Sequence, residues 1–288
     1  MIIDLHTHTT ASDGTDTPEE LVRRAAAAGL AGVAITDHDT LAGSDEGAIA
    51  AEALRLPFIR GLELSTRLLD EKTPQRRTAH ILAFFAHNPC GEFRDWLETL
   101  RASRRARNAA MIERLNRFGF AVSLEEAEAL GRNITGRPHI ARVMAGKGYV
   151  ANIREAFDRF LNEGAPAYVE REDPSTREGI ERVLAAGGVP ALAHLGRMHR
   201  HNPADEETLL ATLVQWGLRA IEVWHSDHDP KRNARYLEYA AKYGLAATGG
   251  SDYHGAHKPG VRLGHGREGS PPAPIQAWHS LTAALGWR

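Results

Sequence analysis

The chain has 288 residues, of which 42% are hydrophobic and 25% are charged, a composition typical of a globular protein. Its length allows one large domain, or a domain with an insertion, to bury a sizeable core. The formal net charge of −2 excludes a general attraction to nucleic acid or membranes, so any anion binding has to be local. The single cysteine, Cys90, excludes an internal disulfide and leaves metal ligation to His, Asp and Glu.

The first third of the chain alternates short apolar strands with helices. Thr17 and Glu20 form a predicted capping box around Pro18, which indicates a helix that ends at Gly29. A second helix is expected at about 43–54, and strands are expected at 2–8, 32–36, 58–64 and 80–85. No signal peptide and no apolar run of membrane-spanning length is visible, which predicts a cytoplasmic protein.

The alternation stops between residues 98 and 167 and resumes afterwards. Helices are expected at 101–117, 123–130, 138–147 and 152–163, with no strand signal until 167–169. This pattern predicts a helical insertion, 98–167, that caps a catalytic domain made of 1–97 and 168–288. We interpret Arg104, Arg105 and Arg107 in the basic helix as a solvated face.

The last third predicts helices at 175–187, 205–216 and 230–243, each followed by a strand, at 189–194, 220–225 and 246–252. Alternating strands and helices are typical of an α/β protein with a parallel sheet. A β/α barrel of roughly seven strands is the preferred architecture, because polar residues at all the strand ends would then converge on one mouth.

Histidines and carboxylates at metal-ligand spacing recur through the chain. His6 and His8 project from one face of an extended strand, and Asp252 and His254 repeat that spacing near the other end. The full set has six imidazoles, three carboxylates and no thiolate: His6, His8, Asp13, His38, Glu63, His80, His194, Asp252 and His254. This set predicts two or three divalent ions, manganese favoured over zinc or iron, which suits phosphate ester hydrolysis by metal-activated water.

These motifs resemble the PHP superfamily, named for polymerase and histidinol phosphatase domains. The matching pieces are Asp4-Leu5-His6-Thr7-His8, Ser12-Asp13-Gly14, Ile35-Thr36-Asp37-His38, Gly61-Leu62-Glu63, Ala79-His80, Ala193-His194 and Ser251-Asp252-Tyr253-His254. The resemblance implies the PHP fold, a distorted (β/α)7 barrel, with a trinuclear metal centre.

The resemblance also implies a distribution of the ligands among three ions. His6, His8 and Asp252 would hold the first ion, with Glu63 bridging to the second. His80 and His194 would complete the second ion. Asp13, His38 and His254 would hold the third.

Three further segments resemble the nucleotide-directed members of this superfamily. They are Ile134-Thr135-Gly136-Arg137-Pro138-His139-Ile140-Ala141, Ile221-Glu222-Val223-Trp224-His225 and Lys258-Pro259. Such members remove the 3′-phosphate from nucleoside 3′,5′-bisphosphates, converting pAp to AMP and phosphate, and some trim short RNA from the 5′ end. A small nucleotide bisphosphate, and short RNA as a second class, are therefore the expected substrates.

A bisphosphate needs cationic groups beyond the metal ligands. Arg137 and Lys258 are expected to hold the 5′-phosphate, and the other substrate-binding candidates are His225, His228, Arg197 and Arg132. The catalytic candidates are Asp13, His194 and His225, with His225 as a possible proton donor to the leaving oxygen.

Three alternatives stay open at this point. A histidinol phosphate phosphatase would use the same metals on another small monoester. An amidohydrolase also begins with a His-x-His pair in a barrel, although Glu63 stands here where such enzymes use a modified lysine. A non-catalytic PHP module would serve as a scaffold only. The oligomeric state is also open, with a monomer as the working assumption.

Overall fold

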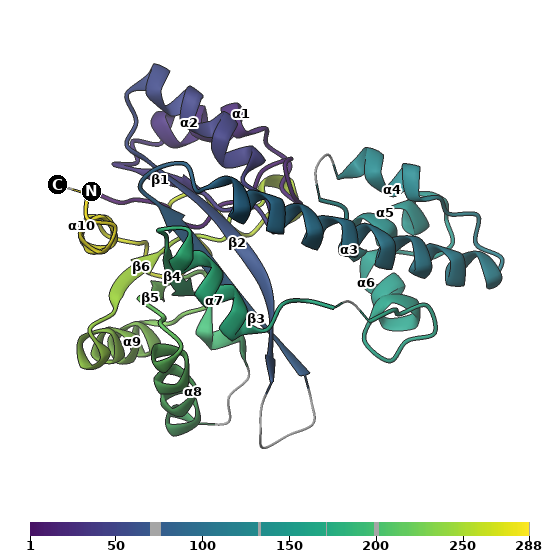
Figure 1. Ribbon diagram of the computed structural model, residues 1–288. Helices are drawn as coiled ribbons and strands as arrows, with labels where there is room; N and C mark the ends of the chain where they lie inside the picture. Colours follow the sequence, from purple (N-terminus) through teal and green to yellow (C-terminus); the bar gives the residue numbers. More distant parts are fainter. Residues whose placement is uncertain (70–75, 132–133, 171, 199–201, 288) are drawn as a thin grey trace.

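The computed structural model describes residues 1–69, 76–131, 134–170, 172–198 and 202–287. It is an α/β structure in which helices surround a curled six-stranded sheet, while a smaller group of helices lies at the far end of one long helix (Figure 1). Arg132, a predicted substrate-binding residue, lies outside the described residues. Within them, no helix is both long and apolar enough to cross a membrane.

The sheet has the strand order β1-β2-β3-β4-β5-β6. The bounds are β1 Val33–Ile35, β2 Phe58–Leu69, β3 Arg76–Phe85, β4 Val189–Leu192, β5 Ala220–Trp224 and β6 Ala246–Gly249. Strand β3 runs antiparallel to both β2 and β4, and the other pairs are parallel. The predicted parallel pairing holds for three strand pairs and was wrong for the two that involve β3, because the six residues between β2 and β3 are too few for the crossover that parallel strands need.

Residues 2–8 form an extended segment, although the predicted strand is not assigned there. The Ala34 amide in β1 donates to the Asp4 carbonyl at 2.8 Å, and the Leu5 amide donates to the Gly249 carbonyl of β6 at 3.1 Å. The segment therefore joins the two edge strands of the sheet through backbone hydrogen bonds.

The helices are α1 Pro18–Ala27, α2 Ala42–Leu54, α3 Gly91–Arg117, α4 Leu124–Leu130, α5 Arg137–Gly146, α6 Ile153–Ala156, α7 Thr176–Ala185, α8 Pro203–Gln215, α9 Pro230–Tyr243 and α10 Ile275–Ala284. The capping box of α1 is confirmed, since the Glu20 amide donates to Thr17 Oγ1 at 3.2 Å and the Thr17 amide donates to Glu20 Oε2 at 2.8 Å. Two predictions were wrong: α3 begins ten residues before the expected start at 101, and residues 167–169 form no strand.

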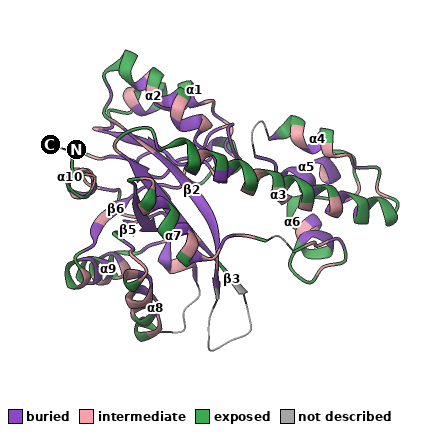
Figure 2. Cartoon of the chain, viewed as in Figure 1, coloured by how far each residue is buried: buried purple, intermediate pink, exposed green. Residues whose placement is uncertain are grey.

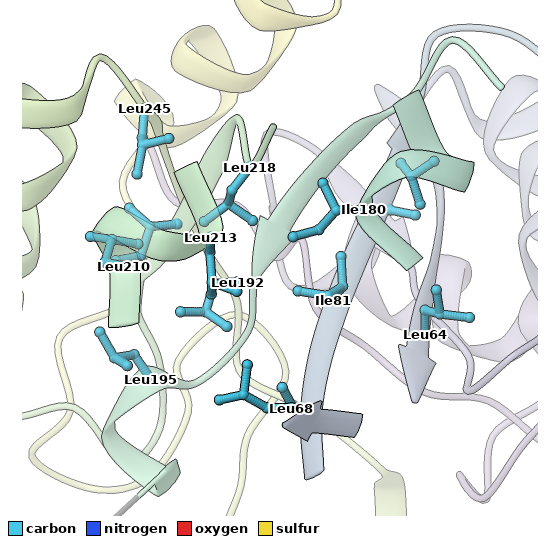
Figure 3. Close-up of a cluster of buried hydrophobic side chains, with 14 of the residues drawn as sticks. Leu64, Leu68, Ile81, Ile180, Leu192, Leu195, Leu210, Leu213, Leu218 and Leu245 are labelled. Carbon is cyan, nitrogen blue, oxygen red and sulfur yellow. The ribbon is translucent and has the colours of Figure 1, made fainter. Parts of the chain in front are cut away.

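The main hydrophobic core lies between the sheet and the helices that follow β3 in the sequence. Figure 3 shows leucine and isoleucine side chains from β2, β3, β4, α7 and α8 meeting there, among them Leu64, Ile81, Ile180, Leu192 and Leu213. The strands are buried over most of their length, while the helices expose their outer faces (Figure 2). The short strands β1 and β4 are accordingly apolar throughout, whereas the longer β2 and β3 also carry polar residues.

Helix α3 is shared between the sheet and the smaller helical group (Figure 1). Its first turns pack on the main core through Phe93, Trp96 and Leu97. Its last turns pack into a separate core through Met111 and Leu115. Most other members of that core come from α4, α5, α6 and the π-helical turn Phe157–Leu161, and the connecting segments add Val122, Val150 and Ala167. The predicted boundary at 97/98 therefore falls inside a continuous helix, and the division into two units stays a prediction.

Candidate metal centre

The structure brings the nine predicted ligands together from seven separate segments. His38, His194, Asp252 and His254 lie shortly after the ends of β1, β4 and β6, whereas Glu63 lies in the middle of β2 and His80 lies within β3. His6, His8 and Asp13 precede the first strand. The long β2–β3 pairing places Glu63 opposite Leu82, so that the antiparallel hairpin delivers two of the predicted ligands to the same side of the sheet.

Glu63 lies at the centre of the group and is 1% exposed. Its Oε1 lies 2.7 Å from His80 Nδ1 and 2.9 Å from His194 Nε2. Three imidazole nitrogens face Oε2, namely His8 Nε2 at 3.2 Å, His38 Nδ1 at 3.2 Å and His6 Nε2 at 3.4 Å. One carboxylate thus contacts two separate sets of imidazoles, an arrangement that suits a bridging ligand.

The other two carboxylates lie on either side of His254. Asp13 Oδ1 is 3.3 Å from His254 Nε2 and 3.6 Å from His8 Nδ1. Asp252 Oδ1 is 3.5 Å from His8 Nε2 and 3.6 Å from His6 Nε2. The donor atoms of His8, Asp13, His38 and His254 lie close enough together to hold one ion.

Neighbouring charges hold the pKa of the three carboxylates low, and burial lowers the pKa of His8, His38 and His194, whereas neighbouring carboxylates raise the pKa of His6 and His254 despite burial. Burial alone would raise the pKa of Glu63, but the charges of His80, His38 and His6 hold it well below its usual value. Burial, with the charge of His254, lowers the pKa of His8 well below the usual range, and burial lowers that of His194 to about 4. Neutral imidazoles beside ionised carboxylates are what divalent metal ligation requires.

The unpartnered nitrogens test whether a cation fits. His6 Nε2, His8 Nε2 and His38 Nδ1 are buried and make no hydrogen bond among the described residues, yet all three face the Glu63 carboxylate. A buried imidazole nitrogen and a carboxylate oxygen that face each other without a hydrogen bond are both available to ligate a cation. The residues present therefore fit a divalent metal ion at this place, with an open set of imidazole and carboxylate donors.

Two of the predicted ligands have strained backbones. The φ angles of His194 and Asp252 are 29° and 57°, in the left-handed region that non-glycine residues rarely adopt. Each lies two or three residues after the end of a strand, β4 or β6. His194 Nε2 faces Glu63 there, and Asp252 Oδ1 faces His6 and His8. Strain of this kind persists where the surrounding structure fixes it, which is common at functional sites.

Glu222 in β5 supports two predicted ligands, and sequence reasoning did not assign it a role. His6 Nδ1 donates to Glu222 Oε1 at 2.8 Å, and the His194 amide donates to Glu222 Oε2 at 2.7 Å. The charges of His6 and His225 outweigh burial and lower the pKa of Glu222 to about 2. The sequence feature that could have indicated this role is that Glu222 is the single carboxylate in the otherwise apolar strand Ala220–Trp224.

Replacing Glu222 by leucine is expected to weaken metal binding by about 10- to 100-fold, because His6 loses the acceptor that fixes its ring orientation. Glu222→Gln keeps an acceptor for one of the two donors, so its effect should be smaller. Metal content per chain, measured after dialysis against defined manganese concentrations, tests this. The exposed Glu238→Leu variant is the control. Equal manganese affinity in Glu222→Leu and Glu238→Leu would contradict the role of Glu222.

Two buried aspartates that were also not assigned hold the surrounding segments. Asp4 accepts hydrogen bonds from the backbone and hydroxyl of Ser251. Asp37 Oδ1 accepts from the Thr9 amide at 2.7 Å and from Ser12 Oγ at 2.5 Å. Burial raises the pKa of Asp37 to about 6 despite these donors. Both aspartates fix the backbone next to the predicted ligands.

Lys258 and Arg197, two predicted phosphate-binding cations, form ion pairs with the predicted ligand Asp252. Lys258 Nζ and one Arg197 amino group are each 2.7 Å from Asp252 Oδ2, and Arg197 Nε also donates to Asp227 at 2.5 Å. These contacts place both cations beside the predicted ligands, and their role in phosphate binding stays a prediction.

His225 and His228, two predicted substrate-binding residues after β5, differ in whether a ring nitrogen is available to a substrate. His225 Nδ1 accepts from the Asp227 amide at 3.0 Å, so the neutral ring carries its proton on Nε2, 3.5 Å from Asp252 Oδ2. His228 Nδ1 donates to the Val223 carbonyl at 2.8 Å, and its Nε2 accepts from the Gly196 amide at 3.2 Å. His228 therefore has no ring nitrogen left for a substrate in this arrangement.

A cavity of about 210 Å³ extends from the predicted ligands towards the helical group. Asp13, His38 and His80 line one part of it, and Arg137 lines another together with Arg104. The interpretation of Arg104 as a solvated residue was wrong, because its guanidinium is 14% exposed and pairs with Asp39. Arg105, one position along α3, is exposed as expected and pairs with Glu128. Arg107 also lines the cavity and donates to Met111 Sδ, so a solvated face does not describe it either.

Known proteins similar to this chain include two bacterial enzymes of similar length. A 3′,5′-nucleoside bisphosphate phosphatase of Chromobacterium violaceum is 32% identical over 285 residues, which cover 98% of this chain and 97% of that protein. A 5′-3′ exoribonuclease of Haemophilus influenzae is 32% identical over 253 residues, covering 87% of this chain and 89% of that protein.

A solved structure from Bifidobacterium adolescentis, described as a metal-dependent phosphoesterase, superposes with a TM-score of 0.81. It is 35% identical in sequence, and the match covers 98% of this chain and 95% of that one. The PHP domain family matches residues 4–134, which contain six of the nine predicted ligands. With its fold, its ligand arrangement and relatives of matching length in agreement, the chain belongs to the PHP domain family.

Proposed function

We propose that the protein is a metal-dependent phosphoesterase that removes the 3′-phosphate of nucleoside 3′,5′-bisphosphates, converting pAp to AMP and phosphate. The observation that carries this proposal is a cavity lined both by predicted metal ligands and by arginines. The bisphosphate phosphatase of C. violaceum, matched along nearly its whole length, supports the same substrate class.

The nine predicted ligands would hold two or three divalent ions, with manganese favoured. Bound ions would supply Lewis-acid charge and lower the pKa of a water molecule for attack on phosphorus. Glu63 holds both sets of imidazoles in place, and Asp13 extends into the cavity. We also propose the distorted (β/α)7 barrel, with residues 2–8 in the place of the seventh strand. Their hydrogen bonds to both sheet edges support it.

The residues around Asp252 supply the remaining roles. Lys258 and Arg197 balance the charge of Asp252 and hold its carboxylate towards the predicted ligands. We propose His225 as the proton donor to the leaving ribose oxygen, because its Nε2 carries the proton and faces the centre. Short RNA is a second substrate class, which the exoribonuclease of H. influenzae supports.

The test compares four phosphate monoesters on purified protein supplied with manganese: pAp, 3′-AMP, 5′-AMP and histidinol phosphate. Phosphate release should be fastest from pAp, because its 3′-ester reaches the metal centre while the other phosphate contacts arginines. Chelation with EDTA should abolish the activity, and manganese should restore it.

The same assay separates this proposal from its rivals. Turnover of histidinol phosphate equal to or faster than that of pAp would replace the nucleotide assignment by a histidinol phosphatase. Hydrolysis of an amide with no phosphate release would favour an amidohydrolase. Fewer than one metal ion per chain in manganese-supplemented protein, with no activity, would favour a non-catalytic module.

A further inference from the structure

Three arginines from separate segments converge on Asp227, which lies in the loop between β5 and α9. Arg197 Nε donates to Asp227 Oδ2 at 2.5 Å, and Arg267 Nε donates to Asp227 Oδ1 at 3.1 Å. One Arg232 amino group donates to the Asp227 carbonyl at 3.2 Å. We call these four residues the Asp227 cluster.

The cluster carries more positive charge than Asp227 balances. Three guanidinium groups contact this one residue, and the neighbouring Asp229 is engaged as the N-cap of α9, where it accepts from the Arg232 amide. Within the described residues, neither terminal amino group of Arg267 makes a hydrogen bond, and its side chain is 50% exposed. The cluster therefore offers N–H donors to an anion that arrives from outside.

The loop that carries Arg267 fits closely against the loop after β5. Gly266 has a φ of 67°, and a Cβ at this position would come within 2.8 Å of Ser226 Oγ. The Arg262 amide donates to the Gly266 carbonyl at 3.0 Å, and the Gly266 amide donates to the Arg262 carbonyl at 2.8 Å. These contacts hold the backbone of Arg267 beside Asp227, so the position of Arg267 does not depend on the ion pair alone.

Arg197 connects the cluster with the predicted metal centre. Its guanidinium contacts Asp227 and also lies 2.7 Å from Asp252 Oδ2, so one side chain spans the distance from the cluster to a predicted ligand. The cavity of about 210 Å³ opens from Asp13 and His38, and among the described residues its lining includes no member of the cluster. The cluster therefore lies outside that cavity, on the Asp252 side of the predicted ligands.

A short RNA that reacts at the metal centre has to extend beyond the cavity. The proposed function places the first nucleotide there, and about 210 Å³ is less than the roughly 300 to 1,000 Å³ of pockets that enclose one drug-sized ligand. Hydrolysis adds water across the bond between the first ribose 3′-oxygen and phosphorus. The 3′-oxygen leaves with a proton, and the hydroxide becomes part of the new 5′-phosphate of the remaining chain. The second nucleotide stays on the phosphorus through its 5′-oxygen, so its own 3′-phosphate lies outside the cavity.

We propose that the Asp227 cluster binds the phosphate that follows the second nucleotide of a short RNA substrate, with Arg267 and Arg232 as its main ligands. This inference rests on the proposed function, because the RNA is taken to react at the predicted metal centre. Planar guanidinium groups donate paired hydrogen bonds to phosphate oxygens, and the excess positive charge attracts them. The site therefore favours the trinucleotide pApApA over the dinucleotide pApA, which ends before this phosphate, and it plays no part in the hydrolysis of pAp.

The experiment compares initial rates of Arg267→Gln and wild type on pAp, pApA and pApApA, with manganese supplied. In wild type, kcat/KM should be higher for pApApA than for pApA. In Arg267→Gln, the value for pApApA should fall about 5-fold, as expected for the loss of one half-exposed ion pair. The values for pAp and pApA should change by less than about 2-fold. Arg232→Gln should show the same pattern.

The salt dependence of binding separates a phosphate contact from an effect on the fold. Each phosphate contact to a single strand contributes about 0.7 to the slope of log affinity against log salt concentration. The ligand is an uncleavable pApApA, in which a methylene group replaces the first 3′-oxygen, and its binding to manganese-supplemented protein is followed by calorimetry. The slope in Arg267→Gln should be smaller than in wild type by about 0.7. The uncleavable pApA should give equal slopes in both proteins.

Arg117→Gln is the matched control, because Arg117 is an exposed arginine at the last residue of α3 and pairs with Glu113. It should behave as wild type with every substrate, and circular dichroism with thermal melting checks the fold of each variant. An equal fall for pAp and pApApA in folded Arg267→Gln protein, or equal wild-type rates for pApA and pApApA, would overturn the site. A wild type that hydrolyses no pAp would contradict the proposed function, and the binding slopes then decide the site alone. Equal slopes in wild type and Arg267→Gln would overturn it.

Discussion

Glu63→Gln protein is expected to lose phosphoesterase activity and most of its bound metal. The substitution keeps the shape of the side chain but removes the negative charge that five imidazoles face. Loss of a residue that only orients a ligand weakens metal binding by about 10- to 100-fold, so loss of a shared ligand should cost at least about 100-fold. Activity should fall at least as far, because both sets of imidazoles depend on the same carboxylate.

Metal content by mass spectrometry and phosphate release from pAp measure the two effects separately. Glu52→Gln, an exposed substitution on α2, is the control and should leave both quantities unchanged. A Glu63→Gln protein with wild-type metal content and activity would show that Glu63 is not a shared ligand. Loss of activity with full metal content would limit its role to catalysis.

The second large effect is expected from Asp4→Ala, measured as the free energy of unfolding. Asp4 is fully buried and accepts from four donors: the Ser251 amide at 2.8 Å, Ser251 Oγ at 2.6 Å, the Gly264 amide at 2.7 Å and the His6 amide at 3.3 Å. Alanine leaves these donors buried without an acceptor, at about 1 to 3 kcal/mol for each badly satisfied group. We expect a loss of about 3 to 5 kcal/mol, a large part of a typical domain's stability.

Urea unfolding followed by circular dichroism, with EDTA present, measures this loss without a contribution from bound metal. Asp95→Ala removes an exposed aspartate from α3 and should change the unfolding free energy by less than about 0.5 kcal/mol. A similar small change in Asp4→Ala would mean that the N-terminal segment is held mainly by its backbone hydrogen bonds.

The proximity of several predicted ligands could be anticipated from local signals in the sequence. His6 and His8 are two residues apart in a segment expected to be extended, and that spacing predicts that both project from one face. Asp252 and His254 have the same spacing, but the backbone there is not extended, because Asp252 has a φ of 57°. His194 follows an apolar strand, so its position at the strand end was also readable. The α1 capping box was predictable for the same reason, since all its contacts lie within four residues.

The supporting residues could not be found in this way, because their partners are distant in the sequence. Glu222 contacts His6 across 216 positions, and Asp4 contacts Ser251 across 247. Arg104 was misread because a helical pattern gives the face of a residue, but not what that face packs against. The antiparallel hairpin was missed because the stretch between Glu63 and His80 has no clear turn motif.

The number of residues in helix α3 determines how the smaller helical group is oriented relative to the cavity. Its 27 residues run without a break from the main core to the second core. Inserting or deleting one residue between Leu97 and Met111 would rotate everything beyond that point by about 100° around the helix axis and shift it by about 1.5 Å. Arg137, in the helical group, would then move away from Arg67 in β2, which keeps its position. Insertions or deletions in α3 are therefore expected to be tolerated only in steps of about one helical turn. We expect the length of α3 to vary less among related chains than the length of the connecting loops.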